Sequence, residues 1–138
     1  MSRVLLSFSG HKLSDEALED LRSEFEEIEE IFIPFIDFEQ DIQEQLTKLI
    51  NLVTCQLDGS KNITIVVPGH SNLSAILYNF LFGVIGHPPD IYMFRESENG
   101  NYMPFKKFKG RDLKKAGRLL REKYFENPNN LKNHKNDS

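Results

Sequence analysis

The segment ITIVVPGHSN, residues 63–72, carries the strongest fold signal in this chain. Its first half, Ile63 to Val67, is apolar and β-branched without alternation, a pattern typical of a central strand that is covered on both faces. Its second half, Pro68 to Asn72, is a tight loop that leads into a helix expected over residues 72–84. A buried strand, a short loop and a helix in succession form the repeating unit of parallel α/β folds.

The same succession extends from this segment toward both ends of the chain. Further strands are expected at residues 4–9, 31–36, 91–95 and 102–108. Further helices are expected to begin at Ser14, behind a capping box at Asp37 and Gln40, and at Arg111. The order predicts a Rossmann-like three-layer α/β sandwich whose sheet is mostly parallel and ends in a C-terminal antiparallel hairpin strand.

Apolar residues at helical spacing predict which side chains of the helices face the core. In the first helix these are Ala17, Leu18, Leu21, Phe25 and Ile28, and in the last helix they are Leu113, Ala116, Leu119, Leu120 and Tyr124. Residues 1–125 are therefore expected to form a single ligand-binding domain. The polar, Asn-rich residues 126–138 are expected to be a disordered tail.

Composition excludes several classes of protein. Hydrophobic residues make up 39% of the 138 residues and charged residues 28%, so neither a collagen-like nor a disordered chain is indicated. No apolar run reaches the roughly 18 residues of a membrane-spanning helix. Cys55 is the only cysteine, and residues 1–6 lack the pattern of a secretory signal. We therefore expect a protein of the reducing cytoplasm with no membrane partner.

The net charge of −4 is distributed unevenly along the chain. Residues 1–60 hold 14 acidic and 4 basic side chains, whereas residues 101–138 hold 4 acidic and 11 basic ones. The acidic first half would repel a long duplex running across it, so long nucleic acid is not an expected partner. A small, compact anion held at one place remains compatible with this distribution.

Two loops are expected to form the ligand site. In open α/β sheets, ligands bind beyond the carboxyl ends of the strands where the strand order reverses, which the usual order places between the first and third strands. Each of the two loops there carries a glycine, a histidine and small hydroxyl residues before a helix N-terminus, an inventory that suits phosphate oxygens. The candidate ligand-binding residues are Ser7, Ser9, Gly10, His11, Pro68, Gly69, His70, Ser71 and Asn72, with Arg95 as a charged partner on the same rim.

The simpler interpretation of these loops is structural. Ser14, Ser71 and Asn72 are residue types that cap helices, and Gly10 and Gly69 are of a type that closes turns. His11 and His70 are the candidate catalytic residues, as general acid and base, and they equally suit hydrogen bonding or phosphate binding. No His, Cys, Asp or Glu set has the spacing of a metal site, and no phosphate-loop or dinucleotide fingerprint occurs, so no metal and no cofactor are expected.

Three stretches give the chain a family likeness. They are Phe8-Ser9-Gly10-His11-Lys12-Leu13-Ser14, the strand and apolar helix from Val66-Val67-Pro68 through Phe80, and Gly86-His87-Pro88-Pro89 through Arg95. In these stretches the chain resembles a small stand-alone CRISPR-associated family of type III loci, the Csx family numbered fifteen. The resemblance implies a Rossmann-like relative of the sensor (CARF-type) domains that bind cyclic oligoadenylates, either a ring nuclease or a protein that sequesters the messenger.

Three hypotheses for the function follow. The first is a protein that binds cyclic tetra-adenylate and lowers its free concentration, as a homodimer or higher homo-oligomer whose two-fold symmetry matches the ring. The second is a metal-independent ring nuclease in which the adenylate 2′-hydroxyl attacks its own phosphate to give a 2′,3′-cyclic phosphate, with His11 or His70 carrying the proton. The third is a Rossmann-like interaction module without a nucleotide ligand.

Overall fold

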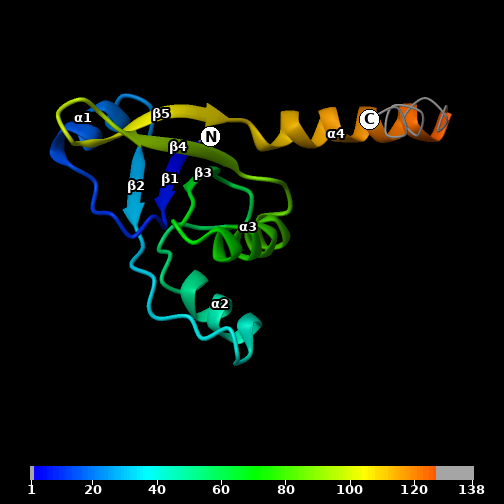
Figure 1. Cartoon of the computed structure of the whole chain (residues 1–138), viewed down its shortest axis with the longest axis horizontal. Helices are drawn as coiled ribbons and strands as arrows, with labels where there is room; N and C mark the ends of the chain where they lie inside the picture. The colour runs from blue at the N-terminus through cyan, green and yellow to red at the C-terminus, as the bar shows by residue number, and fades with distance from the viewer. Residues whose placement is uncertain (1, 127–138) are drawn as a thin grey trace.

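The computed structural model describes residues 2–126 and contains five strands and four helices in that range (Figure 1). The strands are β1 (Arg3–Ser7), β2 (Glu27–Glu30), β3 (Asn62–Val66), β4 (Asp90–Glu96) and β5 (Tyr102–Phe108). The helices are α1 (Asp15–Arg22), α2 (Ile42–Ile50), α3 (Ser71–Ile85) and α4 (Gly110–Glu126). Of the tail expected over residues 126–138, Glu126 is the last residue of α4, and residues 127–138 lie outside the described residues.

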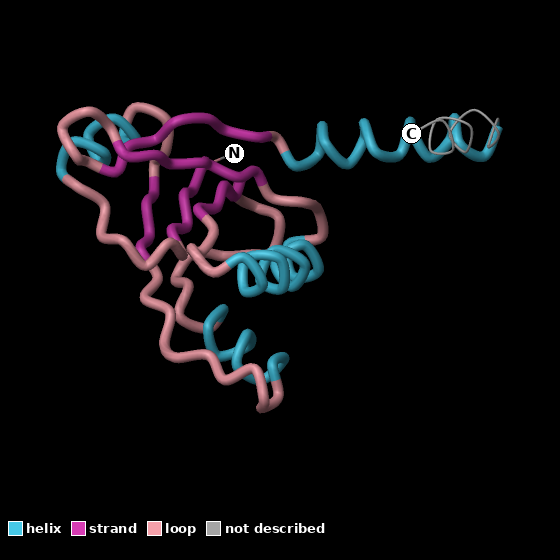
Figure 2. The backbone as a smooth tube through the Cα atoms, in the orientation of Figure 1, coloured by secondary structure: helices cyan, strands magenta, loops and turns pink. Residues whose placement is uncertain are grey.

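The strands form one sheet in the order β2-β1-β3-β4-β5 (Figure 2). The pairs β1–β2, β1–β3 and β3–β4 are parallel, and β4 and β5 pair antiparallel as a hairpin. β1 and β3 lie at the centre, and four of the five residues in each are buried. The segment at residues 63–67 is thus a central strand, as its apolar composition predicts.

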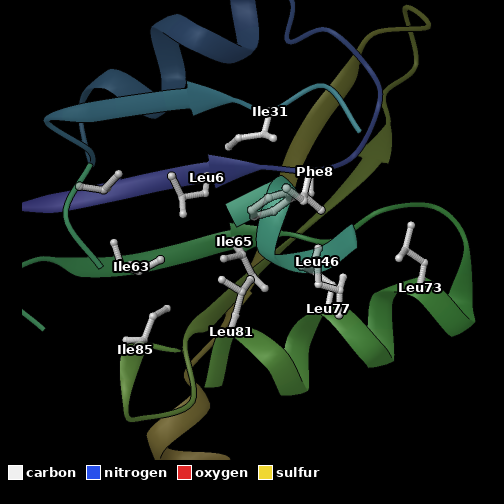
Figure 3. Close-up of a cluster of buried hydrophobic side chains, with 12 residues drawn as sticks. Leu6, Phe8, Ile31, Leu46, Ile63, Ile65, Leu73, Leu77, Leu81 and Ile85 are labelled. Carbon is white, nitrogen blue, oxygen red and sulfur yellow. The ribbon is translucent and has the colours of Figure 1, made fainter. Parts of the chain in front are cut away.

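Two hydrophobic clusters cover the two faces of the sheet. Leu6 of β1 packs with buried side chains of α2 and α3 in the larger cluster (Figure 3). Leu5, its neighbour, packs with Ala17 and Leu21 of α1 in the smaller cluster. Neighbouring residues of a strand point to opposite faces, so α1 lies on one face and α2 and α3 lie on the other. The predicted three-layer α/β sandwich with a C-terminal hairpin strand is confirmed.

The second strand differs from its prediction. Residues 31–37 form a loop, and β2 is instead the acidic stretch Glu27–Glu30, so the helix expected to reach Ile28 ends at Arg22. The acidic residues are accommodated because β2 is an edge strand with polar partners. Glu29 accepts hydrogen bonds from Thr54 and Cys55. Burial alone would raise the pKa of Glu29, but these hydrogen bonds outweigh it and hold the pKa below its ordinary value.

The apolar stretch after β2 leaves the sheet for a backbone reason. The Ile31 N–H still donates to the Ser7 carbonyl oxygen at 2.8 Å, which extends the ladder by one residue. Pro34, three residues further on, has a fixed φ and no N–H, which disfavours continuation of a regular strand. The helix cap that follows is also displaced from its prediction, because the Asp41 carboxylate, and not that of Asp37, accepts hydrogen bonds from the first turn of α2.

The last helix has no inward face. The predicted burial of Leu113, Ala116, Leu119 and Leu120 is wrong, since all four side chains are exposed. Helix α4 leaves the end of β5 and projects away from the sheet (Figure 1). Its first residue, Gly110, is buried against the backbone of Pro88 and Pro89, and its N–H donates to the Asp90 carboxylate at 3.0 Å. This anchor directs the helix outward, where its contact with the rest of the chain is limited to side chains such as Lys114, whose ammonium lies 5.1 Å from the centroid of the Phe82 ring.

Gly110→Ala should destabilise the protein. A Cβ at this position would lie 2.4 Å from the Pro89 carbonyl oxygen and 2.6 Å from that of Pro88. We expect the free energy of unfolding to fall by about 2 kcal/mol, as for overpacked cores. Gly117→Ala in the same helix is the matched control, because a Cβ there meets nothing within 4 Å, and it should stabilise by about 0.5–1 kcal/mol. Urea unfolding measures the free energy of both variants. Equal changes in the two would show that Gly110 is not held in close contact with the backbone of Pro88 and Pro89.

Candidate functional site

The carboxyl ends of three parallel strands, β1, β2 and β3, lie at the same end of the sheet. β1 lies between β2 and β3, so the strand order reverses between β1 and β3, as expected from the usual order of such sheets. The Phe8 N–H donates to the Val66 carbonyl oxygen at 2.8 Å, just where both strands end. The loops after β1 and β3 therefore start on adjacent strands, about 4.8 Å apart. The loop after β2 starts on the other side of β1.

The loop after β1 is held by its own hydroxyl groups. The hydroxyls of Ser7 and Ser9 lie 3.2 Å apart, and the His11 N–H donates to the Ser9 hydroxyl at 3.3 Å. Gly10 has a φ of +77°, in the left-handed region where a side chain is strained. A Cβ on Gly10 would meet nothing within 4 Å, so the backbone there is open to a ligand.

A pocket of about 270 Å³ lies between this loop and the end of β2. Three of the predicted site residues line it, namely Ser7, Gly10 and His11. The other lining residues, which the sequence analysis does not single out, are Lys12, Glu30, Ile31 and Phe32. Residues 31 and 32 escape the sequence analysis because the apolar run 31–36 has the composition of a buried strand.

The pocket carries charges of both signs. Lys12 brings a positive charge to it, and the Glu30 carboxylate accepts a hydrogen bond from the Leu13 N–H at 2.6 Å. A carboxylate would repel a phosphate placed directly beside it, whereas it accepts hydrogen bonds from ribose hydroxyls or an exocyclic amino group. The arrangement therefore suits a ligand with its anionic part toward Gly10 and Lys12 and hydroxyl or amino donors toward Glu30.

The loop after β3 is organised by a helix cap. His70, and neither Ser71 nor Asn72, is the N-cap of α3, and its Nδ1 accepts a hydrogen bond from the Leu73 N–H at 3.2 Å. Nδ1 therefore carries no proton, and in the neutral ring the proton is on Nε2, which is a donor. Ser71 and Asn72 are exposed in the first turn of α3. The Ser74 hydroxyl donates to the carbonyl oxygen of Pro68 and closes the loop.

Exposed aromatic rings connect the two loops. Phe38 stacks on His70, with ring centroids 5.4 Å apart and planes inclined by 26°. Phe32 lines the pocket on the β1 side, so the segment between β2 and α2 runs from one loop to the other. His11 lies against Tyr102 of β5 at 5.1 Å. Only the fold brings Phe38 and Tyr102 to this edge, because both are distant from the loops in sequence.

The two histidines do not form a pair. The pocket that takes His11 has no residue of the loop 68–72 in its lining, and among the described residues no hydrogen bond or ring contact joins His11 to His70. Arg95, the remaining predicted site residue, lies in the β4–β5 hairpin with its guanidinium carbon 3.9 Å from the centroid of the Phe105 ring. Among the residues described, no hydrogen bond, ion pair or cation–π contact joins Arg95 to either loop.

Cys55 is not an activated nucleophile. It lies in the loop after α2, and its backbone N–H donates to Glu29 at 2.9 Å. Burial, followed by the negative charge of Glu29, raises the pKa of the Cys55 thiol to about 12. The thiol is therefore protonated at neutral pH. Within residues 2–126, no three His, Cys, Asp or Glu side chains gather as a metal site requires, and no helix combines the length and apolar character needed to cross a bilayer.

No family model, curated protein or solved structure shows a significant match to this chain. The likeness to the Csx family thus stays an expectation from short motifs.

The cap role of His70 predicts a split between two variants. His70→Ala should lower the free energy of unfolding by about 1 kcal/mol, because the Leu73 N–H loses its acceptor. His70→Asn should retain most of that stability, since asparagine is a favourable N-cap. Urea unfolding measures both variants. An equal loss in the two would show that the ring contact with Phe38, and not the cap, holds the loop.

The raised pKa of Cys55 predicts slow alkylation. At pH 8 the thiolate, which is the reactive form, is a minor species for a thiol whose pKa is about 12. Iodoacetamide should modify the folded protein more than about a hundredfold slower than the urea-unfolded protein, where the thiol has an ordinary pKa. Mass spectrometry over time gives both rates. Similar rates would show that burial and the charge of Glu29 do not raise the pKa of the Cys55 thiol.

Proposed function

We propose that this protein binds cyclic oligoadenylate, in particular cyclic tetra-adenylate, in the cytoplasm and lowers its free concentration by sequestration during type III CRISPR antiviral signalling. The observation that supports this proposal is the meeting of two glycine- and histidine-bearing loops at the point where the strand order reverses. The family likeness of the sequence supplies the identity of the ligand.

Phosphate and ribose groups match the polar atoms at this edge. The open backbone at Gly10 and the Lys12 ammonium offer donors to phosphate oxygens, while the Ser9 hydroxyl, which donates to the His11 carbonyl oxygen, shapes the loop that presents them. On the adjacent loop, Nε2 of His70 is a donor, and Ser71 and Asn72 stand in the exposed first turn of α3. The Glu30 carboxylate accepts from ribose hydroxyls or from an adenine amino group.

Adenine bases match the exposed aromatic rings. Phe32 is 82% exposed and Phe38 is 48% exposed, so both rings are accessible to a base. Base stacking on an aromatic ring is worth about 1–3 kcal/mol per base. Phe32 beside the pocket and Phe38 on His70 give two such rings next to the two loops.

The size of the pocket favours a shared site. A volume of about 270 Å³ lies just below the range of ligand pockets, about 300 to 1,000 Å³, and suits one nucleotide unit of the ring. A cyclic tetra-adenylate would extend beyond it. Two copies related by a two-fold axis, each holding part of one ring, would match the symmetry of the ligand.

Binding is favoured over cleavage by the state of the candidate catalytic groups. Nδ1 of His70 is occupied by the helix cap, so it is not free to accept a proton. Among the described residues, no hydrogen bond joins the His11 ring to a carboxylate that would orient it as a base. Cys55 is a protonated thiol. The metal-independent ring nuclease is therefore the alternative function, and a test must distinguish binding of the intact ring from its cleavage.

Ligand recovery tests the proposal. Excess protein is incubated with cyclic tetra-adenylate, the complex is isolated by gel filtration, and the ligand released on denaturation is chromatographed. We expect the intact ring to co-elute with the protein. Linear products with a 2′,3′-cyclic phosphate would overturn sequestration in favour of the ring nuclease, with His11→Ala as the next variant. A ring that neither co-elutes nor breaks would overturn both and leave an interaction module.

Phe32→Ala should weaken cyclic tetra-adenylate binding by about tenfold, because one stacking contact worth about 1.4 kcal/mol is lost. Phe35→Ala is the matched control: Phe35 is 90% exposed in the same segment but does not line the pocket. It should leave the Kd unchanged. Calorimetric titration gives both values. Equal affinities in the two variants would show that Phe32 does not contact the bases.

A further inference from the structure

Helix α4 presents an apolar stripe that its own chain leaves uncovered. Every side chain from Arg111 to Lys123 is exposed, and the helix projects away from the sheet (Figure 1). At about 100° per residue, one narrow face is apolar or small. Its members are Leu113, Ala116, Gly117, Leu120 and Tyr124. Leu113 is 58% exposed and Leu120 is 56% exposed, so this stripe has the pattern of a contact surface without its partner.

A groove of matching character lies between the loop after β2 and helix α2. Its apolar lining residues are Ile31, Phe32, Pro34, Leu49 and Leu52. Leu52 is 54% exposed. Glu30 and Lys48 also line this β2–α2 groove, and Glu44 pairs with Lys48 at 3.5 Å. The groove thus combines an apolar surface with acidic neighbours.

The stripe and the groove lie at opposite edges of the sheet. β2 is the strand at one edge, and α4 leaves β5 at the other edge. Gly110 fixes the first turn of α4 against Pro88 and Pro89, so the helix cannot swing back across the molecule. Contact between stripe and groove is therefore possible only between two copies of the chain.

Charge favours this pairing over pairing of two α4 helices. Helix α4 carries six basic and three acidic residues. Lys114 and Arg121 flank the stripe on the same side, so two antiparallel copies of α4 would bring these bases together. Residues 1–60, which include β2 and the whole groove, carry the acidic excess of the chain. A basic amphipathic helix and an apolar groove set in the acidic part of the chain are complementary.

We propose that the apolar stripe of α4 docks in the β2–α2 groove of a second copy of this chain. Each stripe–groove contact joins two different surfaces. Two such contacts can close reciprocally into a two-fold dimer, or each copy can give its helix to one neighbour and its groove to another. It does not require the proposed ligand. Because Glu30, Ile31 and Phe32 line both this groove and the pocket beside the β1 loop, docking of α4 and base stacking on Phe32 exclude each other within one protomer. A single helix face belongs to the small class of interfaces, below about 1,200 Å², so the association is expected to increase with protein concentration.

Two substitutions at exposed positions test the contact from both sides. Leu120→Glu places a charge on the stripe, and Leu52→Glu places one in the groove. Sedimentation velocity over a range of concentrations should show self-association of the unmodified protein and a monomer for each variant. An equal mixture of the two variants should form a heterodimer that does not grow further, because the intact helix of one meets the intact groove of the other. Thermal unfolding of each variant checks that the fold is retained.

Leu119→Glu is the matched control. Leu119 is 48% exposed and adjacent to Leu120, but it lies about 100° away around the helix, outside the stripe. This variant should associate like the unmodified protein. A monomeric unmodified protein at every concentration, unaltered association of Leu52→Glu, or a purely monomeric mixture of the two variants would each overturn the proposal. Retained association of Leu52→Glu together with loss in Leu120→Glu would point to pairing of two α4 helices.

Discussion

The parallel pairing of β1 with β3 is the constraint on which the rest of this structure depends. The two strands are buried on both faces and exchange backbone hydrogen bonds up to Phe8 and Val66, where both end. Because β3 occupies one side of β1, β2, which also pairs with β1, lies on its other side, and the strand order reverses between β1 and β3. This single pairing therefore creates the core, the layers and the adjacent loops of the candidate site.

The functional surfaces lie where this central pairing stops. β2 is an edge strand that keeps its acidic side chains because Thr54, Cys55 and Lys61 provide partners for them. Beyond it, the chain leaves the sheet and exposes aromatic rings beside the pocket. At the opposite edge, Gly110 directs α4 away from the sheet. The protein thus presents the candidate ligand pocket and a groove beside the edge strand β2, and the exposed helix α4 beyond the other edge strand, β5.

The candidate site could be located from the sequence but not completed from it. Ser7, Gly10 and His11 meet in one pocket because they belong to a single loop, whose position follows from the strand order. Glu30 and Phe32 join them through a strand that starts earlier than its apolar composition predicts. The role of His70 as the N-cap of α3 could not be predicted from the sequence either, because capping depends on the direction of its side chain relative to the Leu73 N–H.

By itself, the sequence determined the class of the fold, the central position of residues 63–67 and the hairpin of residues 91–108, since unalternating apolar runs and turn signals act locally. The tertiary structure alone decided where β2 begins, which aromatic rings stay exposed and that α4 has no inward face. An amphipathic helix carries the same periodicity whether its apolar face meets its own core or another chain. Only the anchor at Gly110 distinguishes the two, because it sets the direction in which the helix leaves the sheet.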